Sequence, residues 1–120
     1  MAESLCPTCG LSASRIVRRT KGGIVAVPSE IVRDGHVMVV STAHAESFAD
    51  LTPEDAAAFM ALIASATSEA ERESGAHHYV LRIGDKSPHL HFHVVPRAEG
   101  DPALAPFVFG DAGWRSAKPA

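Results

Sequence analysis

Residues 51–74 constrain the fold most, because they carry the strongest helix signal in a chain otherwise rich in short β-branched runs. Thr52 can cap a helix, Pro53 suits its first position, and two acidic residues follow at its positive end. Gly75 is placed to end it. Apolar residues recur at helical spacing and give one apolar face to pack on a sheet: Phe59, Leu62, Ile63, Ala66 and Ala70.

Five other segments have the composition of β-strands. Residues 14–20 and 23–29 flank a Lys-Gly-Gly turn and predict an N-terminal hairpin. Residues 36–41 form a continuous apolar run, which indicates a strand buried on both faces. Residues 78–84 and 89–95 predict a second hairpin. We therefore expect an α+β fold, a mostly antiparallel sheet of about five strands with one long helix packed on it.

The size of the chain suits a single compact domain. It has 120 residues, of which 46% are hydrophobic, and that leaves no room for a second core. We expect one domain over residues 1–120, with an N-terminal Cys-x-x-Cys turn at 6–9, a core at about 15–97 and a C-terminal tail at 98–120. The tail is rich in Pro, Ala and Gly, contains Trp114, and predicts no firm structure.

The charge balance excludes some partners. The formal net charge is -3 and the pI is about 6.1, so the chain lacks the basic excess that binds a polynucleotide. No apolar run approaches the roughly 20 residues that cross a bilayer, and the first residues do not resemble a signal peptide. We expect no nucleic-acid partner, no membrane partner and a cytoplasmic location.

Near the C-terminus, His89, His91 and His93 alternate with apolar residues. In a strand the three imidazoles share one surface, while the apolar residues between them face the core. A solvent-facing polar edge is the alternative, but exposed edges favour Lys, Thr or Glu. Same-face residues lie about 6.6 Å apart, so the outer two are about 13 Å apart, which strains convergence on one metal ion. We expect the three to divide metal binding from nucleophilic or acid–base work.

The only two cysteines, Cys6 and Cys9, have the spacing of half a metal site, which would need two more ligands. Thiols stay reduced in the cytosol, so a structural disulfide is disfavoured. The missing ligands must be His, Asp or Glu, and His44 and His89 are the natural candidates if their strands are neighbours. A redox Cys-x-x-Cys is the competing interpretation, but it normally opens a helix in a βαβ unit. We favour structural zinc.

The segment "HLHFHVV" is similar to the His-φ-His-φ-His-φ-φ motif of the histidine triad (HIT) superfamily. The order of elements is also similar: an N-terminal hairpin, a Gly-His strand, a loop histidine, a Thr-Pro-Glu helix start and the final histidine strand. The "VVPR" that follows, with its later "GD", looks like the dinucleoside polyphosphate hydrolase branch. The Cys pair resembles that of zinc-bearing bacterial members. The resemblance runs from about Cys6 to Asp101.

The resemblance implies a nucleotide hydrolase or nucleotidyl transferase. His91 would attack the α-phosphate of a nucleotide ester, anhydride or phosphoramidate, forming a covalent nucleotidyl-histidine intermediate that water hydrolyses. His93 would hydrogen-bond the phosphate oxygens, and His36 would lie beside the nucleotide pocket, although a buried strand histidine is an equal interpretation. A structural Zn²⁺ would be held by Cys6, Cys9, His44 and His89. Relatives are commonly homodimers, so a homodimer is expected.

The chemistry agrees with this assignment of histidines. Attack needs a neutral ring at His91, whereas His93 helps most as a donor, so we expect their surroundings to separate their pKa values. The sequence departs from the family in the loop before the triad, which is short and lacks the usual Gly-Gln. Arg82, Lys86 and Ser87 are candidate phosphate contacts in its place. An ordinary polar turn is the alternative for them.

Two other functions remain open from the sequence. The missing Gly-Gln motivates a zinc-stabilised nucleotide-binding or regulatory module with little turnover. A weaker third hypothesis is a metalloenzyme whose ion performs the chemistry, which chelation distinguishes from structural zinc.

Overall fold

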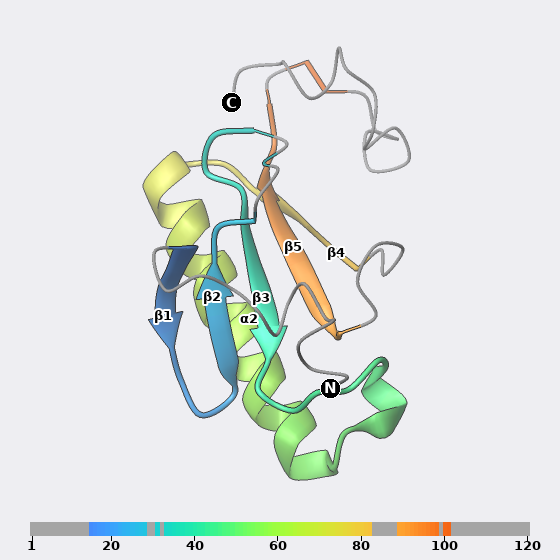
Figure 1. The fold of residues 1–120 in the computed structure, drawn as a ribbon. Helices are drawn as coiled ribbons and strands as arrows, with labels where there is room; N and C mark the ends of the chain where they lie inside the picture. The colour runs from blue at the N-terminus through green and yellow to red at the C-terminus, as the bar shows by residue number, and fades with distance from the viewer. Residues whose placement is uncertain (1–14, 29–30, 32, 83–88, 99, 102–120) are drawn as a thin grey trace.

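Five strands and one long helix make up the described part of the chain. The structure is a computed structural model, and it describes residues 15–28, 31, 33–82, 89–98 and 100–101. The elements, in chain order, are β1 (Ile16–Arg19), β2 (Gly23–Ala26), β3 (Val37–Ser41), the 3-10 turn η2 (Phe48–Asp50), α2 (Pro53–Ser74), β4 (His78–Leu81) and β5 (His91–Pro96) (Figure 1).

The strands form one antiparallel sheet in the order β1-β2-β3-β5-β4. The predicted N-terminal hairpin is β1 and β2, and the second hairpin is β4 and β5. Strand β3 lies between the two hairpins and pairs with β2 on one side and with β5 on the other. In that pairing Val40 lies opposite His91 and Met38 lies opposite His93. Strand β5, which carries His91 and His93, is therefore hydrogen-bonded on both sides, to β3 and to β4.

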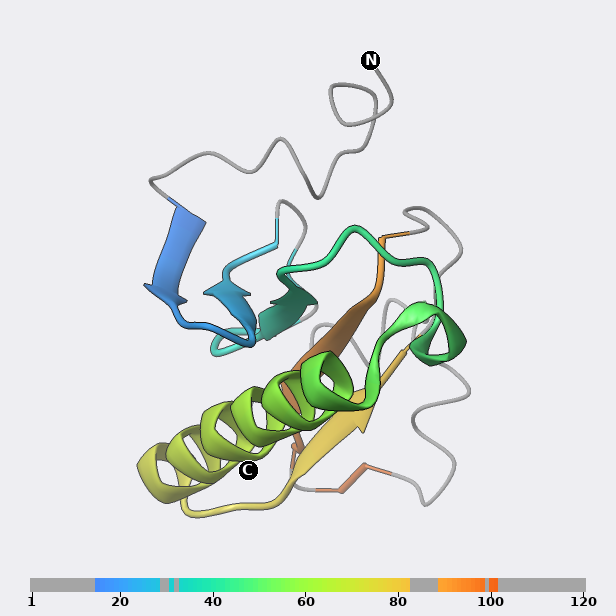
Figure 2. The same ribbon diagram turned by 90° about the horizontal axis from the view of Figure 1, so that it is seen from below.

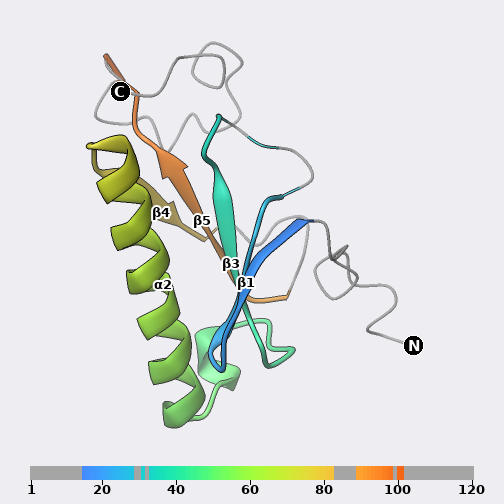
Figure 3. The same cartoon turned by 90° about the vertical axis from the view of Figure 1, so that its left-hand side faces the viewer.

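Helix α2 covers one face of this sheet, as Figures 2 and 3 show from two sides. It begins and ends where the sequence predicts. The Thr52 hydroxyl accepts a hydrogen bond from the Asp55 amide at 3.1 Å, and Gly75 ends the helix with φ of 74°, a left-handed conformation that favours glycine. The predicted apolar face is buried at Phe59, Leu62, Ile63 and Ala66. The expected α+β fold with one packed helix is confirmed.

The sheet carries apolar residues on both faces. On the side of α2 the buried cluster consists of Val25, Val39, Phe59, Leu62, Ile63, Ala66, Leu90 and Val94. On the opposite side Ala26, Met38 and Val40 are buried, with Ile24 packed against them. This explains the continuous apolar run of β3, because its successive residues serve the two faces in turn.

The strand boundaries and one short helical turn differ from the prediction, since β1, β2 and β4 are each shorter than expected. The strand expected at residues 89–95 begins only at His91. The Leu90 amide donates to the Ala45 carbonyl at 2.6 Å, outside the sheet ladder, so residues 89 and 90 are tied to the loop after β3. The turn η2 was not predicted, since three residues leave no periodic signal. No helix among the described residues has the length and apolar character needed to cross a bilayer.

Candidate active site

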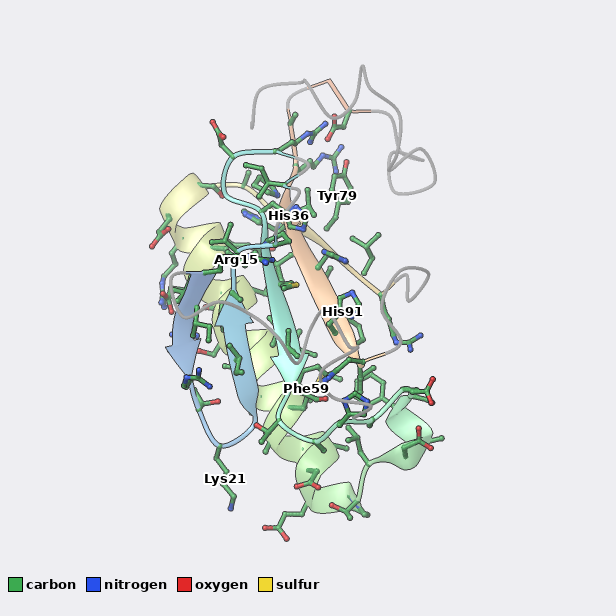
Figure 4. The ribbon with its side chains drawn as sticks, viewed as in Figure 1. Arg15, Lys21, His36, Phe59, Tyr79 and His91 are labelled. Atoms are coloured by element: carbon green, nitrogen blue, oxygen red, sulfur yellow. The ribbon has the colours of Figure 1, made fainter. Side chains whose placement is uncertain are left out.

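The alternation along β5 separates its histidines from the helix. Val94 belongs to the core cluster under α2, and Phe92 packs against that cluster. His91 and His93 therefore project from the opposite face, next to Val40 and Met38 of β3. His91 is only 7% exposed, yet it lies on the face that α2 leaves uncovered (Figure 4).

One nitrogen of His91 is committed to a hydrogen bond. Its Nδ1 lies 2.6 Å from the backbone carbonyl oxygen of His89. A carbonyl oxygen can only accept, so Nδ1 must carry the hydrogen and donate it. In the neutral ring the lone pair is then on Nε2. The backbone therefore selects the tautomer in which the outer nitrogen can act as a nucleophile or a base.

His93 is paired with a fourth histidine. Its Nδ1 lies 2.8 Å from Nε2 of His36, which is 2% exposed in the turn before β3. The rings of His91 and His93 also meet edge to face, with centroids 5.0 Å apart. Three imidazoles from two segments far apart in sequence thus form one contiguous row, which we call the histidine row: His36, His93 and His91.

The environment keeps His93 neutral. Burial, with a smaller contribution from the neighbouring His91, lowers the pKa of His93 to about 4. At neutral pH the ring can therefore donate outward only from its Nε2-H tautomer. In that tautomer Nδ1 would be the acceptor and Nε2 of His36 the donor of the 2.8 Å hydrogen bond between the two rings. A neutral His93 with its hydrogen on Nε2 could therefore act as a donor without carrying a positive charge.

His44 and His89 form a second pair at the other end of β3. Their ring centroids are 4.7 Å apart with the planes at 81°, because hydrogen bonds tie residue 90 to Ser41 and Ala45. Nε2 of His89 donates to the Ser41 carbonyl at 3.0 Å, which leaves its Nδ1 as the nitrogen with a lone pair. Burial lowers the pKa of His89, against the opposing effect of that hydrogen bond, and this favours the neutral ring.

This pair has the chemistry that zinc requires. Two imidazoles side by side, one of them oriented by a hydrogen bond to a backbone carbonyl, match the common arrangement of histidine ligands. The other two predicted ligands, Cys6 and Cys9, lie outside the described residues. Within the described ranges alone, no group of three or more His, Cys, Asp or Glu residues could hold an ion. The donors present therefore fit half of the predicted site.

Of the three predicted phosphate contacts, only Arg82 lies among the described residues. Arg82 is exposed, and its guanidinium donates to the carbonyl of Glu46 in the loop that carries His44. This hydrogen bond ties Arg82 to the loop that carries His44 and not to the histidine row. Lys86, Ser87 and Trp114 lie outside the described residues.

An apolar strip adjoins the histidine row on the same face. The register of β2, β3 and β5 aligns Ile24, Val40 and His91 across the sheet. The next row aligns Ala26, Met38 and His93. Ala26, Met38 and Val40 are buried, so this strip packs beside the imidazoles as a second small core.

Sequence reasoning missed one set of polar residues near the row. Arg33, Tyr79 and Asp101 are joined by hydrogen bonds beyond the C-terminal end of β5. Arg33 and Asp101 are 68 positions apart, so no spacing in the sequence links them. An arginine next to the apolar run of β3 was the only available signal.

Comparisons with known proteins agree with this geometry. A family model described as "HIT domain" matches residues 12–100. Comparison with curated proteins found no significant match. Among solved structures 21 chains match. A hypothetical protein from Leishmania major is 25% identical with a TM-score of 0.65, and the match covers 71% of this chain and 64% of that one.

The C. elegans NitFhit protein is also 25% identical, with a TM-score of 0.66. That match covers 88% of this chain and 27% of the longer one. This chain therefore spans less than two thirds of either structure.

Proposed function

Because this chain belongs to the HIT domain family, whose members are generally nucleotide hydrolases or transferases, we propose that it cleaves a nucleotide at its α-phosphate with His91 as the nucleophile. The substrate would be a nucleotide ester, anhydride or phosphoramidate. The similarity of "VVPR" and "GD" to the dinucleoside polyphosphate hydrolase branch favours an anhydride.

One observation carries this proposal. Nδ1 of His91 donates to the His89 carbonyl at 2.6 Å, so the lone pair of the neutral ring lies on Nε2. An imidazole oriented by a second group is the usual arrangement of an activated histidine.

The reaction would proceed in two displacements. Nε2 of His91 forms a bond to the α-phosphorus, and the bond from phosphorus to the leaving group breaks with its electron pair. The leaving group takes a proton from water. In the second step water attacks the same phosphorus, the P–N bond breaks, and a nucleoside monophosphate and a proton are released.

His93 would stabilise charge on the phosphate. Both displacements place negative charge on the non-bridging oxygens, which a fixed donor stabilises. The outward Nε2-H of His93 would supply that donor, and His36 would maintain the tautomer through the 2.8 Å hydrogen bond.

Zinc would act on the scaffold in this proposal. Cys6, Cys9, His44 and His89 would hold the ion, as in the zinc-bearing bacterial members that the Cys pair resembles. It would supply structural cross-linking of the N-terminal turn to the loop after β3. Since the His89 carbonyl orients His91, fixing residue 89 also supports the nucleophile.

The proposal is tested by single-turnover kinetics on a diadenosine polyphosphate and an adenosine phosphoramidate. His91→Ala should lower the rate by about 10³-fold or more, because the covalent step is lost. His77→Ala is the matched control, since His77 lies outside the row and 93% of its side chain is exposed. Wild-type turnover retained in His91→Ala would rule out the mechanism.

A binding module with little turnover is the second candidate. It is favoured by the sequence of residues 83–88, which lacks the Gly-Gln of active relatives. Calorimetry separates the two functions: nucleotide binding without product formation across both substrate classes would favour the module. As a further expectation from the family, we propose a homodimer, which sedimentation equilibrium would test.

A further inference from the structure

Arg33 and Asp101 form a bidentate ion pair that is hidden from solvent. Nη1 and Nη2 of Arg33 each donate to a different carboxylate oxygen of Asp101, both at 2.7 Å. The side chains are 0% and 3% exposed. Two parallel bonds fix the guanidinium in both position and orientation, which a single bond between point charges would not do.

Further hydrogen bonds extend this pair into a network. Nη1 of Arg33 also donates to the Pro96 carbonyl at 3.0 Å. One Asp101 oxygen accepts from the Tyr79 hydroxyl at 3.0 Å and from the Ala98 amide at 2.9 Å. We call Arg33, Asp101 and Tyr79 the clamp. It joins the turn before β3, the edge strand β4, the end of β5 and the turn after β5.

The clamp is connected through the backbone to both His36 and His93. The His36 amide donates to the Arg33 carbonyl at 3.1 Å, so the two residues close one tight turn. Gly35 in that turn has φ of 91°, and a Cβ there would lie 3.1 Å from the Pro96 ring. His93 is three residues before Pro96 on β5. Figure 4 shows His36 and Tyr79 near this end of β5, with His91 farther along the strand.

We propose that the clamp of Arg33, Asp101 and Tyr79 positions His36 so that its Nε2-H donates to Nδ1 of His93, which places the hydrogen of His93 on Nε2. This inference rests on the proposed function for its catalytic consequence only. The three residues are positioning residues, because they act on the phosphate through the two imidazoles and do not contact it.

The energetics favour positioning over stability as the reason for the clamp. A buried ion pair loses hydration on both charges, and replacing such a pair with apolar residues is often neutral or stabilising. The Arg33–Asp101 pair instead fixes the turn before β3 against the turn after β5 through two hydrogen bonds of 2.7 Å. An acceptor and a donor nitrogen that must meet at 2.8 Å need that level of control.

Imidazole ¹⁵N NMR of the ligand-free protein tests the clamp directly. Wild-type His93 should show one tautomer, with Nδ1 unprotonated and Nε2 protonated. Arg33→Lys keeps the charge but loses the fork, so a mixture of tautomers should appear at His93. Tyr79→Phe removes one hydrogen bond to Asp101 and should produce a smaller change in the same direction.

Arg18→Lys is the matched control. Arg18 donates to Glu69 at 2.7 Å on the other side of the sheet, so the same substitution there should leave the His93 tautomer unchanged. In turnover assays Arg33→Lys should lower kcat about tenfold or more with little change in KM. Tyr79→Phe provides the test if Arg33→Lys does not fold.

The outcomes separate the two proposals. A folded Arg33→Lys or Tyr79→Phe protein with the wild-type tautomer at His93 would overturn the clamp. A shifted tautomer in a protein whose wild type turns over no nucleotide would retain the clamp and refute the hydrolase.

Discussion

At the scale of single residues, hydrogen bonds decide what each histidine can do. The His89 carbonyl fixes the hydrogen of His91 on Nδ1, and the Ser41 carbonyl fixes that of His89 on Nε2. His36 and His93 share one hydrogen bond between ring nitrogens. For His91 and His89 the hydrogen-bond partner of the ring therefore sets which ring nitrogen carries the hydrogen.

The pKa of His93 gives a prediction for the dependence of stability on pH. An unfolded histidine titrates near 6.5, whereas burial lowers the pKa of His93 in the folded protein to about 4. Between these values the unfolded state binds more protons than the folded state. The free energy of unfolding should therefore fall as the pH is lowered from about 6.5 to about 4.

Urea titrations across that range would measure this effect. In His93→Gln the free energy of unfolding should depend less steeply on pH, by the amount that corresponds to uptake of about one proton on unfolding. Equal slopes in the two proteins would show that His93 is not buried in its neutral form.

Asp101 titrates in a separate window. The hydrogen bonds from Arg33 are the main cause of its low pKa, about 2 against an ordinary value of 3.8. The unfolded carboxylate takes up a proton first, so this contribution is present above about pH 4 and is lost as the pH falls toward about 2. Asp101→Asn should remove that dependence and destabilise the protein at pH 7 by about 3 to 5 kcal/mol, because it leaves the Arg33 charge buried and unpaired.

Acid unfolding of the two proteins checks this prediction. Asp50→Asn is a suitable control on the exposed turn η2 and should change stability at pH 7 by less than about 0.5 kcal/mol. A similar small change in Asp101→Asn would contradict the burial of the pair.

At the scale of elements, α2 supplies the support behind the site. Phe59 is 0% exposed, and its ring lies 6.0 Å from that of Phe92, which stands between the two histidines of β5. Gly22 lets the β1–β2 turn approach closely, because a Cβ there would lie 2.3 Å from the Ala58 carbonyl oxygen in α2. The helix therefore fixes the sheet from the face opposite the imidazoles.

Two adjacent helix positions should differ sharply in their effect on stability. Phe59→Ala should lower the free energy of unfolding by about 3 to 5 kcal/mol, since it creates a cavity beneath β5. Met60→Ala, at a neighbouring side chain that is 50% exposed, should cost less than about 1 kcal/mol. Chemical denaturation measures both, and comparable losses would mean that α2 does not pack as described.

At the scale of the whole molecule, the proposed zinc ties together segments that are far apart in sequence. His44 and His89 already meet, and the predicted Cys6 and Cys9 would complete four ligands. Removing the metal with a chelator should lower the melting temperature and release about one zinc per chain, and Cys6→Ser with Cys9→Ser should do the same. Turnover lost with the fold intact would instead indicate a catalytic ion.

Much of the fold follows from patterns that are local in sequence. The helix has its cap, its apolar period and its terminal glycine within 25 residues, and the alternation of β5 sorts its own residues between two faces. The clamp could not be predicted, since Arg33 and Asp101 meet only after β3 and β5 pair. The His36–His93 hydrogen bond has the same cause, because strand register sets which imidazoles face each other.

The central claim is that Nε2 of His91 forms a bond to phosphorus, and trapping that intermediate tests it most directly. The protein would be mixed with a diadenosine polyphosphate, quenched within milliseconds in alkali, which preserves phosphoramidates, and digested for mass spectrometry. We expect an adenylyl group on the peptide containing residue 91, at His91 itself, and none in His91→Ala. An adenylyl group on another residue, or rapid product formation with no adduct at any time, would contradict the account.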